Sequence, residues 1–167
     1  MLRELWRLYE STGRPGGRPN LTRIIPNLLV GEYPTPDDAA WLCSEHQVTA
    51  VFNLQDDADL AGKGLDLRDL QRAYREHHLG FHRVPIPDGD MDILAARLDR
   101  IVGLLGQLLA GEHCVYLHCN AGRNRAPTVA IAYLHVHGGL PLAAARDFVK
   151  ERRPCVPYMQ VLKAHYG

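Results

Sequence analysis

The sequence predicts a single α/β domain with a central, mainly parallel sheet that helices cover on both faces. Its 167 residues fit one domain. With 46% hydrophobic and 23% charged residues, the chain has enough apolar material for a buried core. Short apolar runs alternate with segments of helical periodicity, which is typical of a parallel sheet with helices on both sides. We expect residues 1–20 to form an N-terminal helix and a Gly/Pro/Arg linker, and residues 21–167 to form the domain.

Each predicted element rests on a local pattern. Apolar side chains at helical spacing predict an amphipathic helix over residues 1–10. The predicted strands are the short apolar runs at 28–30, 48–54, 81–84 and 113–118. Helical spacing or helix-start signals predict helices at 36–45, 66–78, 93–109, 126–137, 142–152 and 157–166. Polar residues at 55–59, and two prolines with a glycine at 85–90, predict loops.

Composition excludes several classes of function. Nineteen basic and nineteen acidic residues cancel, so no overall charge draws the chain to nucleic acid or to a membrane surface. No apolar stretch approaches the roughly 18 residues of a membrane span, and the N-terminus lacks the apolar core of a secretion signal. We therefore expect a cytoplasmic monomer in which the cysteines stay reduced. These cysteines are Cys43, Cys114, Cys119 and Cys155.

The segment that follows the predicted strand at 113–118 carries the chemistry. Cys119 and Arg125 are separated by five residues, with Gly122 between them and a helix directly behind. Unpaired amides at a helix N-terminus, and amides in a tight loop, bind anions without a metal. Gly122 allows the loop to curl closely around the anion. We expect a phosphate loop made of Asn120, Ala121, Gly122, Arg123, Asn124 and Arg125.

Two side chains of this loop fit phosphoryl transfer. The Arg125 guanidinium is a planar fork that can hold two phosphate oxygens. A nearby cation and a helix N-terminus favour the thiolate form of a cysteine, so Cys119 is the predicted nucleophile, forming a phosphocysteine intermediate. His118 is expected to hydrogen-bond the loop and tune Cys119. No cofactor or metal is needed.

The leaving group needs a proton donor, and the upstream Pro/Gly loop offers three aspartates. Asp88, Asp90 and Asp92 all precede the nucleophile by about thirty residues, in a loop able to bring an acid over it. For Asp90 and Asp92 the favoured interpretation is a solvated helix N-terminus. Farther along the chain, one arginine of the Arg152-Arg153 pair is a candidate to brace the phosphate loop.

Two simpler interpretations compete with the catalytic one. A cysteine before a helix is usually a small core residue, but the complete loop pattern is much rarer. His113, Cys114, His118 and Cys119 also suggest a metal cluster. Neighbouring residues of a strand point to opposite faces, so these four side chains cannot converge on one tetrahedral ion.

The motif His118-Cys119-x-x-Gly122-x-x-Arg125 resembles the signature of the protein tyrosine phosphatase superfamily, and the short domain with its upstream Asp loop resembles the dual-specificity branch. The resemblance implies a sheet of about five strands, with Cys119 as nucleophile and Arg125 as phosphate ligand. In that family the general acid stands about six residues before a leucine of the next helix. Asp88 and Leu94 reproduce this offset and Asp90 does not, so the resemblance implies Asp88.

A finer similarity links the chain to plant glucan phosphatases. It rests on residues 28–31, 34–36, 52–60 and 64–66 and on Arg125-Ala126-Pro127. Three features depart from that group: no carbohydrate-binding module is evident, Gly89 replaces an aromatic residue, and Asn53 replaces a cysteine. Ala126 stands where most of the superfamily has Ser or Thr, which implies slower breakdown of the phosphoenzyme.

Three hypotheses of function follow. The first is a phosphomonoesterase acting on phosphotyrosine and on phosphoserine or phosphothreonine. The second is a phosphatase of phosphoglucan, inositol phosphate or phospholipid. Arg123, inside the loop, resembles the basic residues in the loop of mitochondrial lipid-phosphate phosphatases. A further cation there favours substrates that carry additional phosphates. The third is a phosphate-binding pseudoenzyme. An intact Cys119 disfavours the third, because a binder needs no thiolate.

Overall fold

The sheet of the computed structural model, which describes residues 17–167, has five strands in the order β1-β2-β5-β3-β4. The strands are β1 (Leu21–Ile25), β2 (Leu28–Gly31), β3 (Ala50–Asn53), β4 (Gly80–Arg83) and β5 (Val115–His118). Only β1 is antiparallel to its neighbour; β2, β5, β3 and β4 pair in parallel. The expected fold, a mostly parallel sheet of about five strands in an α/β domain, is confirmed.

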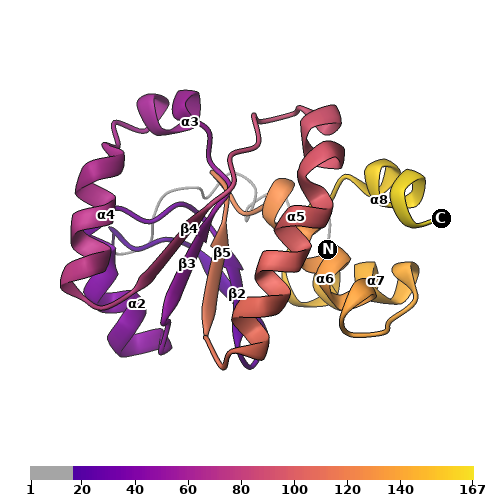
Figure 1. Cartoon of the computed structure of the whole chain (residues 1–167), viewed down its shortest axis with the longest axis horizontal. Coiled ribbons are helices and arrows are strands. Elements are labelled where there is room, and N and C mark those ends of the chain that lie inside the picture. The colour runs from indigo at the N-terminus through magenta and orange to yellow at the C-terminus, as the bar shows by residue number, and fades with distance from the viewer. Residues whose placement is uncertain (1–16) are drawn as a thin grey trace.

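Helices cover both faces of this sheet (Figure 1). Within residues 17–167, the short helices η2 (Pro36–Asp38) and α3 (Asp57–Gly62) accompany six longer ones. These are α2 (Ala39–His46), α4 (Leu67–Glu76), α5 (Met91–Ala110), α6 (Arg125–Val136), α7 (Leu142–Arg152) and α8 (Met159–Tyr166). In Figure 1, α2 and α4 lie on one side of the strands, while α5 to α8 lie on the other.

The alternation of side chains along each strand builds two separate cores. In β5, Tyr116 faces the core under α2 and α4, where it packs with Leu42 and Tyr74. Its neighbours Val115 and Leu117 face the larger core under α5 and α6. Successive residues of a strand point to opposite faces, so fully buried strands such as β5 carry apolar side chains on both. This sandwiching holds the C-terminal end of β5 rigidly in the middle of the sheet.

The structure corrects two sequence-based expectations. Residues 21–25 form β1, an edge strand that was not predicted because Thr22 and Arg23 interrupt its apolar pattern. The predicted loop at 55–59 contains the start of α3, where Asp56 and Asp59 form a capping box. The predicted helix at 1–10 lies outside the described residues, and the proposed domain start near Leu21 stays a prediction. No helix in the described part of the chain is long and apolar enough to cross a membrane.

Candidate active site

The predicted phosphate loop, residues 120–125, lies at the C-terminal end of the central strand. β5 ends at His118, between β2 and β3, and α6 begins seven residues later at Arg125. In parallel sheets ligands collect at this edge, where strand ends meet helix starts. Cys119, which immediately precedes the loop, is 2% exposed. The predicted nucleophile therefore lies at the base of the loop.

The first turn of α6 is left open toward the loop. Its N-cap residue, Asn124, makes no side-chain bond to the helix amides. Its side-chain nitrogen instead donates to the carbonyl of Val156 at 2.6 Å. Helix N-terminal amides carry partial positive charge and favour an anion. The loop therefore ends against an uncapped, electropositive helix start.

Gly122 is required by both its conformation and its surroundings. Its φ is +65°, the left-handed region that favours glycine. A Cβ atom here would stand 2.5 Å from the carbonyl carbon and oxygen of Gly31, at the end of β2. The loop thus packs backbone against backbone with the neighbouring strand, and this contact fixes its curvature.

Arg125 points into the domain, not into solvent. Its guanidinium is buried, and Nη1 donates to Asp59 Oδ2 at 2.6 Å and to the carbonyl of Ile86 at 2.7 Å. Burial disfavours the charged form, but the bond to Asp59, and then the nearby Cys119, outweigh it and raise the pKa of Arg125. The buried Nε has no hydrogen-bond partner among the described residues. Nε, which lies 3.6 Å from Asp88 Oδ1, is thus able to donate to a ligand.

Asp59 links Arg125 to the start of the loop. Its Oδ1 accepts a bond from Asn120 Nδ2 at 2.7 Å, and Gln55 Nε2 donates to Asn120 Oδ1 at 2.8 Å. Burial opposes ionisation of Asp59, yet the bonds from Arg125 and from the Asp56 amide outweigh it and lower its pKa. Asp59 is therefore a buried carboxylate whose negative charge balances the positive charge of Arg125.

The upstream loop brings one of its three aspartates to the site. Asp88 is 60% exposed, and its Oδ1 lies 3.6 Å from Arg125 Nε. Asp90 is the N-cap of α5 and accepts the Ile93 amide at 2.9 Å. Asp92 lies in the first turn of α5. Residues 87–92 line a surface hollow of about 460 Å³. Asp88 thus faces Arg125, whereas Asp90 and Asp92 lie at the N-terminus of α5.

His118 is a neutral residue beneath the loop. Its ring is fully buried and stacks on Tyr116 with centroids 5.6 Å apart. Burial lowers the pKa of His118 to about 4. Nδ1 lies 3.0 Å from the Cys119 carbonyl oxygen, which can only accept, so Nδ1 carries the proton. The expected bond to the loop is present, and His118 supports Cys119 through the backbone without adding a charge.

Comparison with known proteins decides the family. The profile described as "Dual specificity phosphatase, catalytic domain" matches residues 30–164. The chain belongs to this family. It is 38% identical over 135 residues to "Dual specificity protein phosphatase 16" of Homo sapiens, covering 81% of this chain and 18% of that protein. It is 34% identical over 151 residues to "Phosphoglucan phosphatase DSP4, amyloplastic" of Castanea sativa, covering 87% and 39%.

The fold is shared with solved phosphatase structures. The crystal structure of PTPMT1 superposes with a TM-score of 0.71 at 21% identity, covering 87% of this chain and 91% of that one. At this identity the likeness concerns the fold. The chain spans less than half the length of the two curated relatives. The expected membership of the dual-specificity branch, with its finer similarity to plant glucan phosphatases, is confirmed.

In this dual specificity phosphatase domain, Arg153 is the arginine that braces the predicted phosphate loop. Its Nε donates to the Gly122 carbonyl at 2.7 Å and its Nη2 to the Ala121 carbonyl at 3.1 Å. Nη1 reaches Asn20 and Thr22 at the start of β1. Arg152 instead lies over the Phe148 ring, 3.4 Å from its centroid. These bonds hold the Ala121 and Gly122 carbonyls against the buried Arg153 side chain and so fix the backbone of the loop.

The sequence did not single out Asp59 or Tyr158. Asp59 carries a weak signal, since acidic residues at 56 and 59 match a capping box, but nothing local links it to Arg125, 66 residues later. Tyr158 follows the Arg153-Pro154 turn and reaches the same site from the C-terminal segment. Both positions depend on contacts between distant parts of the chain.

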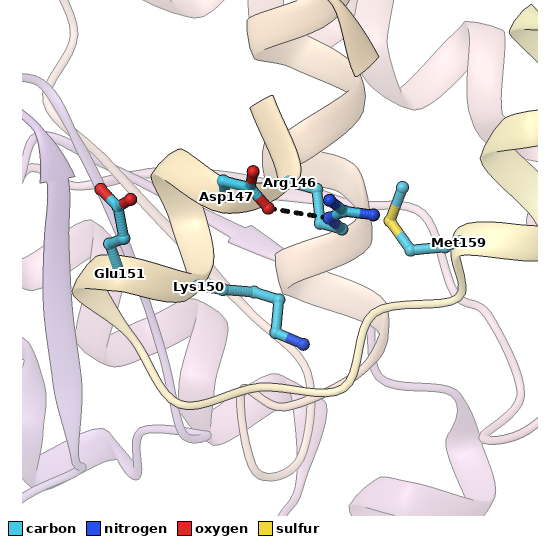
Figure 2. Close-up of a pocket in the computed structure, with 5 residues that line it drawn as sticks. All are labelled: Arg146, Asp147, Lys150, Glu151 and Met159. Carbon is cyan, nitrogen blue, oxygen red and sulfur yellow. Dashed lines mark hydrogen bonds and ion pairs between the residues drawn. The ribbon is translucent and has the colours of Figure 1, made fainter. Parts of the chain in front are cut away.

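The described residues that line a second pocket of the phosphatase domain do not include Cys119, Arg125 or Asp88. It has a volume of about 570 Å³ and is lined by Arg146, Asp147, Lys150, Glu151 and Met159 (Figure 2). Arg146 and Asp147 pair at 2.9 Å across its wall. The remaining charges extend separately from α7 (Figure 2). Charges of both signs at an open surface are typical of a solvated helix face, and we assign the pocket no ligand.

Proposed function

We propose that this chain is a metal-independent phosphomonoesterase that works through a phosphocysteine. The Cys119 thiolate attacks phosphorus and forms the S–P bond. As the P–O bond to the leaving group breaks, Asp88 transfers its proton to the leaving oxygen. In the second step Asp88 takes a proton from water, and the resulting hydroxide attacks phosphorus. The S–P bond then breaks, which regenerates the Cys119 thiolate and releases inorganic phosphate.

The predicted phosphate loop stabilises both steps. The amides of residues 120–125 and Arg125 hold the non-bridging oxygens, where charge develops in the transition state. The observation that carries this proposal is the buried Arg125 guanidinium, which is within electrostatic range of Cys119. Its Nε makes no hydrogen bond among the described residues and lies 3.6 Å from Asp88 Oδ1. Buried donors are nearly always paired in folded proteins. A phosphate oxygen is the acceptor that completes this fork.

For the substrate, we propose phosphotyrosine together with phosphoserine or phosphothreonine in proteins. The similarity to a human protein named as a dual specificity protein phosphatase supports this choice. A phosphoglucan substrate is the second candidate, supported by the 34% identical chestnut relative named as a phosphoglucan phosphatase. The exposed Gly89 beside the proposed acid offers no ring to stack on a sugar, which favours the phosphoprotein.

A phosphate-release panel tests the activity and the substrate together. It compares phosphotyrosine and phosphoserine peptides, solubilised phosphoglucan and inositol phosphates, all in the presence of a chelator. We expect release from the peptides to exceed release from phosphoglucan. Cys119→Ser should abolish hydrolysis while inorganic phosphate still raises the melting temperature. Residual turnover in that variant would refute the assignment of the nucleophile.

The two neighbouring aspartates test the general acid. Asp88→Ala should slow hydrolysis by roughly 10²-fold or more for poor leaving groups, and much less for nitrophenyl phosphate. Asp90→Ala removes the cap of α5 and should cost about 1 kcal/mol of stability with little change in leaving-group dependence. If Asp90→Ala shows the larger kinetic effect, the choice of acid is wrong.

We also propose that the protein acts as a cytoplasmic monomer. Its four cysteines are unpaired, which suits a reducing compartment, and its charges balance. Light scattering of the purified chain tests whether it is a monomer, and fractionation of the source cells tests the cytoplasmic location.

A further inference from the structure

Four side chains form a hydrogen-bond network that joins the two ends of the predicted phosphate loop. Gln55, which lies just after β3, donates from Nε2 to Asn120 Oδ1 at 2.8 Å. Asn120 Nδ2 donates to Asp59 Oδ1 at 2.7 Å, and Arg125 Nη1 donates to Asp59 Oδ2 at 2.6 Å. Asn120 is the first residue of the loop and Arg125 is the last. The network therefore connects both ends of the loop through α3.

The donors and acceptors of this network have one consistent arrangement. Asp59 forms an ion pair with Arg125, and an ionised carboxylate can only accept hydrogen bonds. Asn120 must therefore present Nδ2 to Asp59 and Oδ1 to Gln55. Gln55 must in turn present its donor, Nε2. The amide of Gln55 thus supports the orientation that Asp59 requires of Asn120.

Gln55 keeps this orientation although one of its own atoms is left unpaired. Its side chain is fully buried, and its Oε1 has no hydrogen-bond partner among the described residues. Buried polar atoms without a partner are rare in folded proteins. Turning the amide over would place Oε1 against Asn120 Oδ1, so that two acceptors would face each other. The bond to Asn120 is therefore the contact that decides how the Gln55 side chain is oriented.

Backbone hydrogen bonds hold Gln55 and Asn120 in place for this contact. The Gln55 amide donates to Asn53 Oδ1 at 2.6 Å, and the Gln55 carbonyl accepts from Arg83 Nε at 3.1 Å. The Asn120 carbonyl accepts from the Tyr33 amide at 2.9 Å. Neither residue can follow a displaced partner without breaking these bonds. The contact between the two side chains is thus built on fixed backbone positions after β3 and β5.

The far end of the network holds the Asp59 carboxylate by both oxygens. Oδ1 accepts from Asn120, and Oδ2 accepts from Arg125 and from the Asp56 amide at 3.0 Å. A carboxylate that is bound at both oxygens has a fixed plane, which sets the direction from which Arg125 Nη1 approaches. Loss of the bond at Oδ1 frees the carboxylate to rotate, and the guanidinium can then shift with it.

We propose that Gln55 is a positioning residue for phosphoryl transfer: its bond orients the Asn120 amide, which holds Asp59 where that carboxylate directs Arg125 toward the phosphate. The inference rests on the proposed phosphatase function and adds to it a residue outside the loop. A misplacement of about 1 Å in a group that binds the reacting atoms can cost about 10²-fold in rate. Because Gln55 acts through two intermediate residues, we expect a smaller loss, of about tenfold.

Gln55→Glu makes the contact depend on pH. A protonated carboxyl can still donate to Asn120 Oδ1, whereas an ionised one can only accept. Burial and the Asp59 carboxylate raise the pKa of the introduced carboxyl. Arg83 and Arg125 oppose this less, since each is paired with an aspartate.

The measurement is kcat/KM with nitrophenyl phosphate, divided at each pH by the value for the unsubstituted chain. This ratio cancels the titration of Cys119 and Asp88, which both proteins share. We expect Gln55→Glu to be within about twofold of the unsubstituted chain at about pH 5 and about tenfold slower at about pH 8. A ratio that does not change with pH would overturn the proposal.

An Asn120→Ala background separates positioning from a direct effect of charge. An ionised carboxyl near the loop also repels phosphate through space, and that repulsion does not need Asn120. If Gln55 acts through Asn120, adding Gln55→Glu in this background should leave the rate unchanged at every pH, and adding Gln55→Leu should cause no further loss. A pH-dependent loss that persists in Asn120→Ala would mean that the charge acts directly, and would refute the inference.

Gln107→Glu is the control for the substitution itself. Gln107 is exposed on α5, so the same change there should stay within about twofold of the unsubstituted chain at every pH. If the unsubstituted chain does not hydrolyse nitrophenyl phosphate, or if Cys119→Ser does, the proposed function fails and this inference fails with it. An active unsubstituted chain with a constant Gln55→Glu ratio would overturn the inference alone.

Discussion

Replacing Asp59 by asparagine should damage both the stability and the catalysis of this domain. Asp59 Oδ2 accepts bonds from Arg125 Nη1 at 2.6 Å and from the Asp56 amide at 3.0 Å, while Oδ1 accepts from Asn120 Nδ2. An asparagine keeps the shape but has one acceptor oxygen for these donors and no charge. Its amide nitrogen must face one of them.

The structure sets the expected magnitude. The Asp59 and Arg125 side chains are 8% and 2% exposed, so the substitution leaves a buried cation without its counter-charge. Removing one partner of such a pair costs about 3–5 kcal/mol. Asp57 is a matched control on the same helix. It pairs with Arg83 at 2.8 Å but is 93% exposed, and such surface pairs contribute about 0–1 kcal/mol.

Urea unfolding and steady-state hydrolysis of nitrophenyl phosphate measure the two effects. We expect Asp59→Asn to lose about 3–5 kcal/mol and at least about tenfold in kcat/KM, because a misplaced Arg125 no longer fits the phosphate. Asp57→Asn should remain within about 1 kcal/mol and about twofold in rate. Equal losses in the two variants would refute the argument that Asp59 orients Arg125.

Three further predictions concern the loop and its supports. Gly122→Ala should lower the free energy of unfolding by about 2–3 kcal/mol or more, because of strain and the backbone clash with Gly31. Gly89→Ala has open space around it and should cost about 1 kcal/mol. Urea unfolding compares the two variants, and equal costs would contradict the clash. The pKa of His118 is about 4 in the folded state and 6.5 in the reference state. As pH drops, the unfolded chain therefore takes up its proton first. The free energy of unfolding then falls between about pH 6.5 and about pH 4, by about 3 kcal/mol in all. His118→Asn should flatten that part of the pH–stability curve, and an unchanged slope would count against it. Ala126→Ser should speed breakdown of the phosphoenzyme and reduce any pre-steady-state burst; an unchanged rate with no burst in either enzyme would show that breakdown does not limit turnover.

Sequence patterns predicted most of the fold because most elements carry a local signal. The apolar runs around β2, β3 and β5 and the long periodic stretch of α5 all appear in the structure, with ends displaced by a few residues. The edge strand β1 was missed because one face is partly exposed and its pattern is mixed. The start of α3 was missed because its capping aspartates look like a polar loop.

The sequence predicted the chemical type of the site, but it did not predict the geometry of the site. A cysteine and an arginine five residues apart, with a glycine between them and a helix behind, predict an anion-binding loop by local backbone physics alone. Asp59 and Arg153 approach that loop from α3 and from the end of α7. Their placement depends on packing between segments far apart in the chain.

The tertiary structure likewise separated Asp88 from Asp90, a choice that the residues alone left open. Both are acidic and lie two positions apart, and the offset to Leu94 that favours Asp88 comes from the family resemblance, not from the chemistry of the residues. Asp90 caps α5 by accepting the Ile93 amide, a local contact. Asp88 lies 3.6 Å from the buried Arg125 Nε, a contact between segments far apart in the chain. Local sequence fixes which groups can react, because that depends on residue type and backbone shape. Which of them meet depends on how the sheet and its helices pack, because long-range contacts set those distances.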